Sequence, residues 1–251
     1  MTVVRLDAVA SAATPTTSFT LSELPPRAAY KLLIGTVVPR PIAWVTTVDP
    51  EGRVNAAPYS FFNCLSADPP ILALGVENWP DMRYKDTALN IRMTEEFTVN
   101  IVSDALVEVM NVTATPFPAD VDELKLAGLT AIPGTHVRTP RIGEAPVAFE
   151  CRRHVGVAVG KSREIVLGLV LAIHIRSDLV DPATHYVDQS ELDAIGRMGG
   201  HGYARTRDLF DLKTMSRADW ESGSIPTRSP APDRTNNPNQ KITSQKGKIG
   251  R

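Results

Sequence analysis

The amino-acid sequence predicts a mainly β protein with a few short helices, folded as a closed or partly open antiparallel barrel. Three observations support this fold class. At least six short segments are rich in β-branched and aromatic residues, two of them are joined by a tight turn, and helical periodicity is confined to short stretches. A chain of 251 residues is long enough for one such domain or for two small ones.

The first expected elements are a helix and a β-hairpin. A proline pair precedes residues 27–33, and good helix formers after a proline predict a short helix. Residues 42–48 predict a strand, residues 49–52 (DPEG) a turn, and the extended pattern resumes at Val54. Two strands joined so directly must pair antiparallel.

Later segments predict core strands and two more helices. Residues 71–76 and 97–102 are short apolar runs bounded by breakers, and residues 87–93 before the second run predict a helix. Residues 104–112 carry apolar side chains at helical spacing, with Asp104 as the expected N-cap. Further strands are expected at residues 147–150, 154–160 and 165–175.

Composition divides the chain into one body and two terminal segments. Residues 1–20 predict a flexible leader, although Phe19 and Leu21 are able to start a strand. Residues 21–218 predict a single domain. Residues 219–251 are rich in Ser, Pro, Asn, Gln and Lys and predict a tail that is flexible or wraps a partner subunit.

The charge and the apolar pattern exclude several partners. A formal net charge of -1 gives no reason to expect nucleic acid or an anionic membrane surface. The sequence has no apolar run of about 18 residues and no secretory signal, so a cytoplasmic protein is expected. The two cysteines, Cys64 and Cys151, are expected to be free, buried thiols. The five histidines lack metal-binding spacing, so no metal site is predicted.

The predicted hairpin has the residue types that hold a flat cofactor. Arg40 precedes a strand that ends in paired threonines, and residues 55–60 bring small side chains and hydrogen-bonding groups alongside it. Small residues such as Ala56 and Ala57 let the main chain approach a planar ring closely. The alternative is an ordinary hairpin with one polar, exposed face.

Residues 85–90 (KDTALN) have the pattern of a phosphate site. A lysine followed by a helix start offers a cation, a hydroxyl and free backbone N–H groups to an anion. Lys85 and Thr87 are the expected phosphate ligands, with Arg83 and Arg40 as further candidates. The alternative is a solvated turn in which Asp86 caps the helix.

Residues 196–203 (GRMGGHGY) form a glycine-dense loop with three side chains able to meet a ligand. Arg197 would favour negative charge or bind an anionic substrate, Tyr203 would stack or donate a hydrogen bond, and His201 is the histidine best placed for function. The alternative is a plain turn. The loop is not a dinucleotide fingerprint, because no βαβ unit surrounds it.

A few isolated side chains have both a functional and a structural interpretation. Cys64 follows the hairpin, but a lone thiol is more often packing than chemistry. His154 and His174 lie in expected strands and either face the active-site mouth or are satisfied or exposed strand residues. Trp44 and Trp79 would stack on a ring or fill a core, and Trp79, on a loop, has the better claim to a ligand.

Four segments, taken in order, resemble one known family. They are residues 40–47 (RPIAWVTT), 55–63 (NAAPYSFFN), 85–91 (KDTALNI) and 195–203 (IGRMGGHGY). Over roughly residues 20–215 the sequence is similar to the flavin reductase-like family of FMN-binding split-barrel proteins. That family includes flavoredoxin and the reductase components of two-component monooxygenases.

The resemblance implies a six-stranded antiparallel Greek-key split barrel that forms a homodimer, with FMN in a groove at the subunit interface. By the family pattern, Thr46 and Thr47 lie near the flavin tail, residues 55–60 run along the isoalloxazine, and Asn63 is a lesser candidate. The expected cofactor-binding residues are Arg40, Thr46, Thr47, Asn55, Ala56, Ala57, Pro58, Tyr59, Ser60, Asn63, Lys85, Thr87 and Asn90, and the expected catalytic residues are Arg197, His201 and Tyr203.

The function that follows is an NAD(P)H-dependent flavin reductase, which passes hydride to the flavin and then electrons to free flavin, another small acceptor or a partner oxygenase. Two alternatives stay open. One is an FMN enzyme that acts directly on a small organic substrate, and the other is a flavin- or haem-binding carrier without turnover, because fold alone does not decide function.

Overall fold

The structure, a computed structural model, describes residues 15–230 and divides into two compact units. Val37–Arg207 form the unit that carries the main sheet, and the described residues of the other unit are 15–36 and 208–230. The second unit contains a 3-10 turn (Leu21–Glu23) and the helix α1 (Pro26–Thr36), and near the C-terminus β15 (Phe210–Asp211), α6 (Arg217–Ser222) and β16 (Ser229–Pro230).

The expected terminal segments lie only partly within the described residues. Residues 1–14 of the predicted leader and 231–251 of the predicted tail are outside them. The helix expected at 27–33 is confirmed as α1, but Leu21 begins a 3-10 turn rather than a strand. The predicted start of the tail falls inside α6, which is held by a capping box between Ser216 and Asp219.

The predicted hairpin is confirmed. β2 (Ala43–Val48) and β3 (Val54–Tyr59) pair antiparallel, with Thr47 opposite Asn55. The turn between them closes through a hydrogen bond from the Gly52 N–H to the Asp49 carbonyl, and Gly52 adopts a φ of 85°, which glycine accepts without strain. β3 is an edge strand, so one side of its backbone is free to meet other groups.

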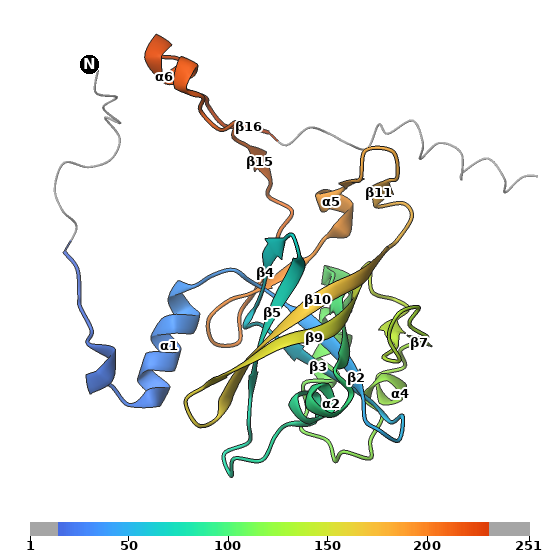
Figure 1. The fold of residues 1–251 in the computed structure, drawn as a ribbon. Coiled ribbons are helices and arrows are strands. Elements are labelled where there is room, and N and C mark those ends of the chain that lie inside the picture. The colour runs from blue at the N-terminus through green and yellow to red at the C-terminus, as the bar shows by residue number, and fades with distance from the viewer. Residues whose placement is uncertain (1–14, 231–251) are drawn as a thin grey trace, which may run out of the picture. The chain divides into compact units, whose positions relative to one another are not determined.

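The mainly β fold is confirmed, with seven strands rather than six in the main sheet, in the order β3-β2-β6-β9-β10-β5-β4 (Figure 1). The additional strand is β4 (Phe62–Ala67), a mostly exposed edge strand whose polar residues hide its pattern in the sequence. β5 (Pro70–Glu77) and β6 (Glu96–Ile101) match the expected core strands. The remaining strands of this sheet are β9 (Val147–Val159) and β10 (Arg163–Ile175).

The two longest strands correct one expectation. The segments 147–150 and 154–160 were expected as separate strands, but they form the single strand β9. The polar residues between them, Arg152 and Arg153, interrupt the apolar pattern without interrupting the ladder, because Arg152 pairs with Leu169 and Arg153 with Gly168.

Two hydrophobic clusters lie on opposite faces of β2. Ala43 and Val45 belong to a cluster that also contains Leu74 of β5, although three strands separate β2 from β5 in the sheet order. The sheet must therefore curl so that its inner faces meet, as expected of a barrel. Ile42 and Trp44 pack in the second cluster, which the helices after β6 cover.

The helices that follow complete the site. α2 (Asp86–Thr94) confirms the helix expected at 87–93, and its N-cap is Lys85 rather than Asp86. Residues 104–112 form a 3-10 turn (Asp104–Leu106) and then α3 (Val107–Val112). Asp104 is therefore not an N-cap. Its carboxylate instead forms ion pairs with Arg205 and Arg207. α4 (Glu123–Leu126) begins after the N-cap Asp122.

Short strand pairs bring the glycine-dense loop to the hairpin. β1 (Arg40–Pro41), β13 (Ile195–Arg197) and β14 (Tyr203–Arg205) form a small sheet in which Arg40 lies opposite Arg197. The other short elements of this unit are β7 (Ala131–Ile132), β8 (Arg141–Ile142), β11 (Val180–Asp181), β12 (Tyr186–Val187) and α5 (Gln189–Leu192).

Candidate functional site

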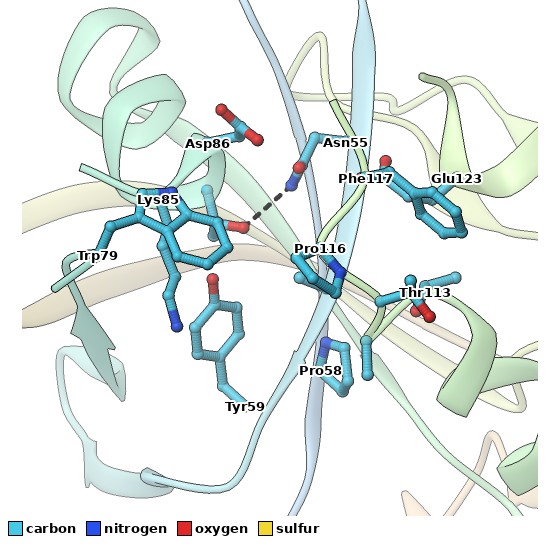
Figure 2. Close-up of a pocket in the computed structure, with 14 residues that line it drawn as sticks. Asn55, Pro58, Tyr59, Trp79, Lys85, Asp86, Thr113, Pro116, Phe117 and Glu123 are labelled. Atoms are coloured by element: carbon cyan, nitrogen blue, oxygen red, sulfur yellow. Dashed lines mark hydrogen bonds between the residues drawn. The ribbon is translucent and has the colours of Figure 1, made fainter. Parts of the chain in front are cut away.

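Two adjoining cavities lie along β3 and share Pro58, Tyr59 and Ala114 as lining residues. The larger cavity has a volume of about 310 Å³ (Figure 2). Its walls are β3, the start of α2, α4, and the loop that follows α3. The smaller has a volume of about 180 Å³. Nine of the expected site residues line one cavity or both: Asn55, Ala57, Pro58, Tyr59, Ser60, Lys85, Thr87, Arg197 and Tyr203.

One side of the larger cavity is built to meet an anion. Lys85 is the N-cap of α2 and makes no side-chain capping bond, so its side chain occupies none of the backbone N–H groups of the first helical turn. The Lys85 ammonium lies 5.1 Å from the centroid of the Trp79 ring. The Asn55 amide donates to the Thr87 hydroxyl at 3.0 Å, which ties β3 to the first turn of α2.

The same cavity contains two carboxyl groups. Asp86 is half-buried, and Glu123 is only 6% exposed. Burial raises the pKa of Asp86, and burial together with the nearby Asp86 charge raises the pKa of Glu123. Burial also raises the pKa of Tyr59 to about 12, so this phenol stays protonated at neutral pH. The cavity therefore offers hydrogen-bond acceptors beside its cationic side.

The smaller cavity is lined by Arg197, Tyr203, Ser60 and the loop residue Asn111, among others. The Arg197 guanidinium lies over the Tyr203 ring, 4.5 Å from its centroid, and donates to the Gly200 carbonyl at 2.7 Å. This bond closes the glycine-dense loop, and Arg197 remains a lining residue of the smaller cavity. An anionic group or an electron-rich ring would suit this cavity.

Three expected site residues line neither cavity: two lie on the surface and one is buried nearby. His201 and Asn63 are exposed, and the Asn63 amide oxygen accepts the next backbone N–H. Arg40 is 7% exposed, and its guanidinium donates to the Ser60 hydroxyl and to the Met198 carbonyl. Arg40 therefore joins the hairpin to the glycine-dense loop, on the Ser60 side rather than at Lys85.

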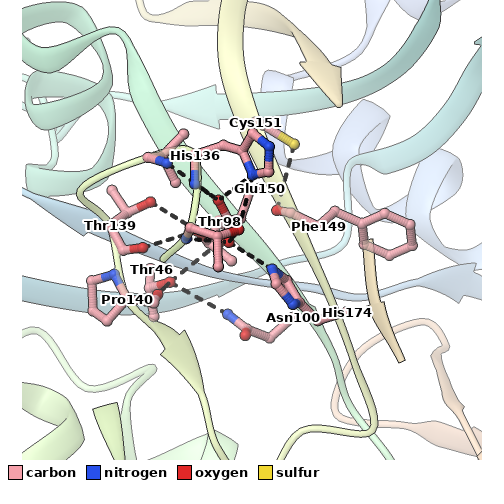
Figure 3. Close-up of polar contacts among 12 residues, drawn as sticks. Thr46, Thr98, Asn100, His136, Thr139, Pro140, Phe149, Glu150, Cys151 and His174 are labelled. Carbon is pink, nitrogen blue, oxygen red and sulfur yellow. Dashed lines mark hydrogen bonds and ion pairs between the residues drawn. The ribbon is translucent and has the colours of Figure 1, made fainter. Parts of the chain in front are cut away.

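Four more expected residues support the site from inside the protein. Thr46, Thr47, Ala56 and Asn90 are buried. The Thr46 hydroxyl donates to the Pro140 carbonyl (Figure 3), and Thr46 lies on the face of β2 that also carries Trp44. The Asn90 amide donates to the Thr47 hydroxyl at 3.1 Å, which fastens α2 to β2. These groups position the groove, and their hydrogen bonds are used within the fold.

Of the tryptophans and cysteines considered above, some lie in the core and others lie at a cavity or on the surface. Trp44 is a core residue whose indole N–H donates to Thr113, whereas Trp79 lines the larger cavity. Of the two free thiols expected to be buried, Cys151 is buried, and burial raises its pKa. Cys64 is exposed, because it belongs to the unrecognised edge strand β4.

The two strand histidines have structural surroundings. His154 is exposed. His174 Nε2 lies 2.6 Å from Glu150 Oε1, and Glu150 also accepts backbone N–H groups from residues 135–137 (Figure 3). This network fastens the loop before β8 to the sheet, away from the groove.

One wall of the larger cavity was not predicted from the sequence. Residues 113–117 and Glu123 line it. The only local signals are the two prolines at Pro116 and Pro118, which indicate a loop after a helix, and the Asp122 N-cap, which places Glu123 at a helix start. Neither signal says that these residues fold over β3.

Within residues 15–230, membrane-spanning helices and clusters of metal ligands are both absent. No helix there is long and apolar enough to cross a membrane. No group of three or more His, Cys, Asp or Glu side chains in the same residues is arranged to hold a metal ion.

The fold and the site together define an antiparallel β protein with two adjoining cavities along one edge strand. Residues 34–192 match the family described as flavin reductase like domain, so the chain belongs to that family. Membership indicates a flavin-dependent oxidoreductase. The confirmed part of the functional expectation is this broader class.

Solved structures agree with this assignment. The chain is 35% identical to 2-nitrobenzoate 2-nitroreductase of Pseudomonas fluorescens, with a TM-score of 0.74 over 80% of this chain and 98% of the other. It is 32% identical to nitrilotriacetate monooxygenase component B of Bacillus cereus, with a TM-score of 0.76 over 80% of this chain and 100% of the other. A putative flavin reductase with a split barrel domain from Shewanella frigidimarina, 19% identical, matches in fold with a TM-score of 0.69 over 80% of this chain and 100% of the other.

Proposed function

We propose that the protein binds FMN and works as an NAD(P)H-dependent flavin reductase. The observation that carries this proposal is the groove along β3, which has an anion-binding side at Lys85 and a cationic second cavity at Arg197. FMN, when bound, supplies the hydride acceptor and passes electrons on. The similarity to a monooxygenase component B supports a partner oxygenase, or free flavin, as the acceptor.

The residues of the groove fit the parts of FMN. Lys85, Thr87 and the free N–H groups at the start of α2 would hold the phosphate. Ala57 and Pro58 present little side chain, so that a planar ring system can lie against β3. Arg197 would stabilise negative charge in the smaller cavity, with Tyr203 holding its guanidinium in place.

The buried residues behind the groove would act by positioning. Thr47 and Asn90 hold α2 against β2, and Arg40 holds Ser60 beside the glycine-dense loop. Loss of these bonds would move the phosphate side and the ring side of the groove relative to each other. We therefore expect Thr47 and Asn90 to affect FMN affinity through α2 rather than by contact.

The test is a visible absorbance spectrum of the purified protein with added FMN, followed by NADH and NADPH oxidation with and without free FMN. Retained or titratable yellow chromophore and flavin-dependent nicotinamide oxidation are expected. A protein that neither binds FMN nor oxidises a nicotinamide would disprove the proposal.

A second candidate is an FMN enzyme that reduces a small organic substrate directly. It is favoured by the 35% identity to a nitroreductase and by Arg197 in the smaller cavity, where an anionic substrate would find a guanidinium. Such an enzyme would hold FMN tightly, and its nicotinamide consumption would require the organic substrate rather than free flavin. A protein that binds FMN and is reduced by no donor would instead be a carrier.

We also propose a homodimer as the working form. The face of the main sheet opposite the core carries exposed apolar residues, since Val157 of β9 lies opposite Ile165 of β10 and both side chains are exposed. Uncovered apolar surface of this kind marks protein contacts. Light scattering should give a molar mass twice that of the chain. Val157→Lys, which places a charge on this apolar surface, should lower the measured mass. A cytoplasmic location stays a prediction.

A further inference from the structure

Glu123 is buried at a place where its structural role is small. It is the first residue of α4, is 6% exposed, and lines the larger cavity. Its Oε2 accepts the Ala56 backbone N–H at 3.1 Å. Because β3 is an edge strand, this N–H points away from β2, and Glu123 satisfies it. One backbone N–H needs an acceptor, but it does not need a charge.

The surroundings of Glu123 stabilise its negative charge too weakly to offset burial, so its pKa is raised. Within residues 15–230 it forms no salt bridge, and Asp86 adds a second carboxylate to the same cavity. Lys85 is the one cationic side chain among the described residues that line this cavity, and its ammonium lies over Trp79. Figure 2 shows Glu123 across the cavity from Lys85. The donors that the protein supplies to this carboxylate are its own backbone N–H and that of Ala56, and a buried carboxylate with so few donors is costly unless a ligand supplies another.

The two sides of the cavity therefore call for two different groups on one ligand. The Lys85 side suits a phosphate, and the Glu123 side suits a neutral hydrogen-bond donor. A cation would also suit a carboxylate, but the described residues assemble no cluster of three metal-ligating side chains. A phosphorylated polyol carries an anion and hydroxyl donors a few bonds apart.

We propose that Glu123 determines specificity in the groove by accepting a hydrogen bond from a hydroxyl of a phosphorylated polyol chain. This inference rests on the proposed function, since the ribityl phosphate of FMN is such a chain. Glu123 then selects FMN against flavins whose chain lacks hydroxyls, and Lys85 selects it against flavins that lack the phosphate.

The test compares two ligands on three proteins by flavin fluorescence titration. The ligands are FMN and a flavin whose chain at N10 is a phosphorylated pentyl group, which keeps the phosphate and removes the hydroxyls. The proteins are the wild type, Glu123→Gln and Glu144→Gln. Glu144 is the matched control, because it also accepts a backbone N–H, that of Thr130, but lies on an exposed loop outside the groove.

The wild type and Glu144→Gln should bind FMN about tenfold or more tightly than the pentyl analogue, as expected for a hydrogen bond to a charged group. Glu123→Gln keeps an oxygen for the Ala56 N–H and should lose most of this preference. Equal binding of both ligands by the wild type would overturn the inference without any variant, as would an undiminished preference in a folded Glu123→Gln. Failure of the wild type to bind either ligand would instead overturn the proposed function.

Discussion

Two buried glutamates of this protein have opposite surroundings. Glu150 has no exposed surface and accepts hydrogen bonds from three backbone N–H groups, the Thr135 hydroxyl and His174. Burial alone would raise its pKa, but these donors outweigh burial and lower the pKa to about 2. Glu123 has one such donor from another residue, and burial raises its pKa.

The difference separates structural from functional burial of charge. Glu150 is fully satisfied inside the fold, so it stabilises the loop that also supplies the Pro140 carbonyl to Thr46. Glu123 accepts far fewer hydrogen bonds and lines a cavity. A buried group of this second kind costs stability and is expected where a ligand completes its hydrogen bonds.

The largest expected effect is on stability, at Glu150. Glu150→Ala leaves three backbone N–H groups and His174 without their acceptor, and should lower the free energy of unfolding by about 3–5 kcal/mol. Urea unfolding of the variant measures it. Glu144→Ala, which removes an acceptor from an exposed backbone N–H, should cost less than about 1 kcal/mol. Equal losses in free energy of unfolding for Glu150→Ala and Glu144→Ala would contradict the conclusion that the buried hydrogen bonds of Glu150 stabilise the fold.

The pH dependence of stability should have opposite signs at the two glutamates. The folded pKa of Glu150, about 2, is below its ordinary value of 4.5, so its stabilisation is present above pH 4.5 and is lost as the pH falls toward 2. The pKa of Glu123 in the folded protein is raised above its ordinary value of 4.5. Its contribution to folding stability is therefore fully present below pH 4.5 and is lost as the pH rises through the pKa of the folded protein.

Urea unfolding between pH 2 and pH 7 checks both signs. Glu150→Gln should flatten the acid limb of the profile. Glu123→Gln should be as stable as the wild type or more stable at pH 7, since it removes a buried charge. A Glu123→Gln variant that is clearly less stable at pH 7 would mean that this charge is structural.

A smaller effect is expected at the phosphate side of the groove. Lys85→Ala should weaken FMN binding about tenfold and leave riboflavin binding nearly unchanged, because only FMN carries the phosphate. Fluorescence titration of both flavins measures this. Arg83→Ala is the control, since Arg83 is exposed and pairs with Asp81. Equal losses for FMN and riboflavin would place the phosphate elsewhere.

A comparable effect on turnover, with little on binding, is expected at the smaller cavity. Arg197→Ala should lower the rate of nicotinamide-dependent flavin reduction about tenfold while FMN affinity changes less than about threefold, since Arg197 lies beyond the phosphate side. His201→Ala should leave both values unchanged, because His201 is exposed and lines neither cavity. A large effect of His201→Ala would support the prediction that His201 is a catalytic residue.

The smallest expected effect is at Cys64. The thiol is exposed on the edge strand β4 and lines neither cavity. Cys64→Ser should leave FMN affinity and the unfolding midpoint within error. A measurable change in FMN affinity would bring β4 into the site.

The sequence predicted what local patterns determine. The hairpin follows from β-branched strands around DPEG, and α2 follows from KDTALN after an extended segment. Lys85, Thr87, Arg197 and Tyr203 were predicted because each stands in a motif, and the structure brings them to adjoining cavities along one strand.

The sequence could not predict what tertiary packing determines. Nothing local shows that Glu123 satisfies an N–H of β3, or that the loop at residues 113–117 closes the larger cavity. The motif residue Thr46 looks equivalent to Thr47, yet side chains alternate along a strand, so the Thr46 hydroxyl meets Pro140 while that of Thr47 meets Asn90. β4 was missed because an exposed edge strand needs no apolar pattern.

Titration of the purified protein with FMN, followed by flavin fluorescence, tests the central claim most directly. Saturable binding of one FMN per chain, weakened about tenfold by Lys85→Ala, is the expected result. Absence of saturable binding, or binding that Lys85→Ala leaves unchanged, would contradict the assignment of the groove along β3 as an FMN site.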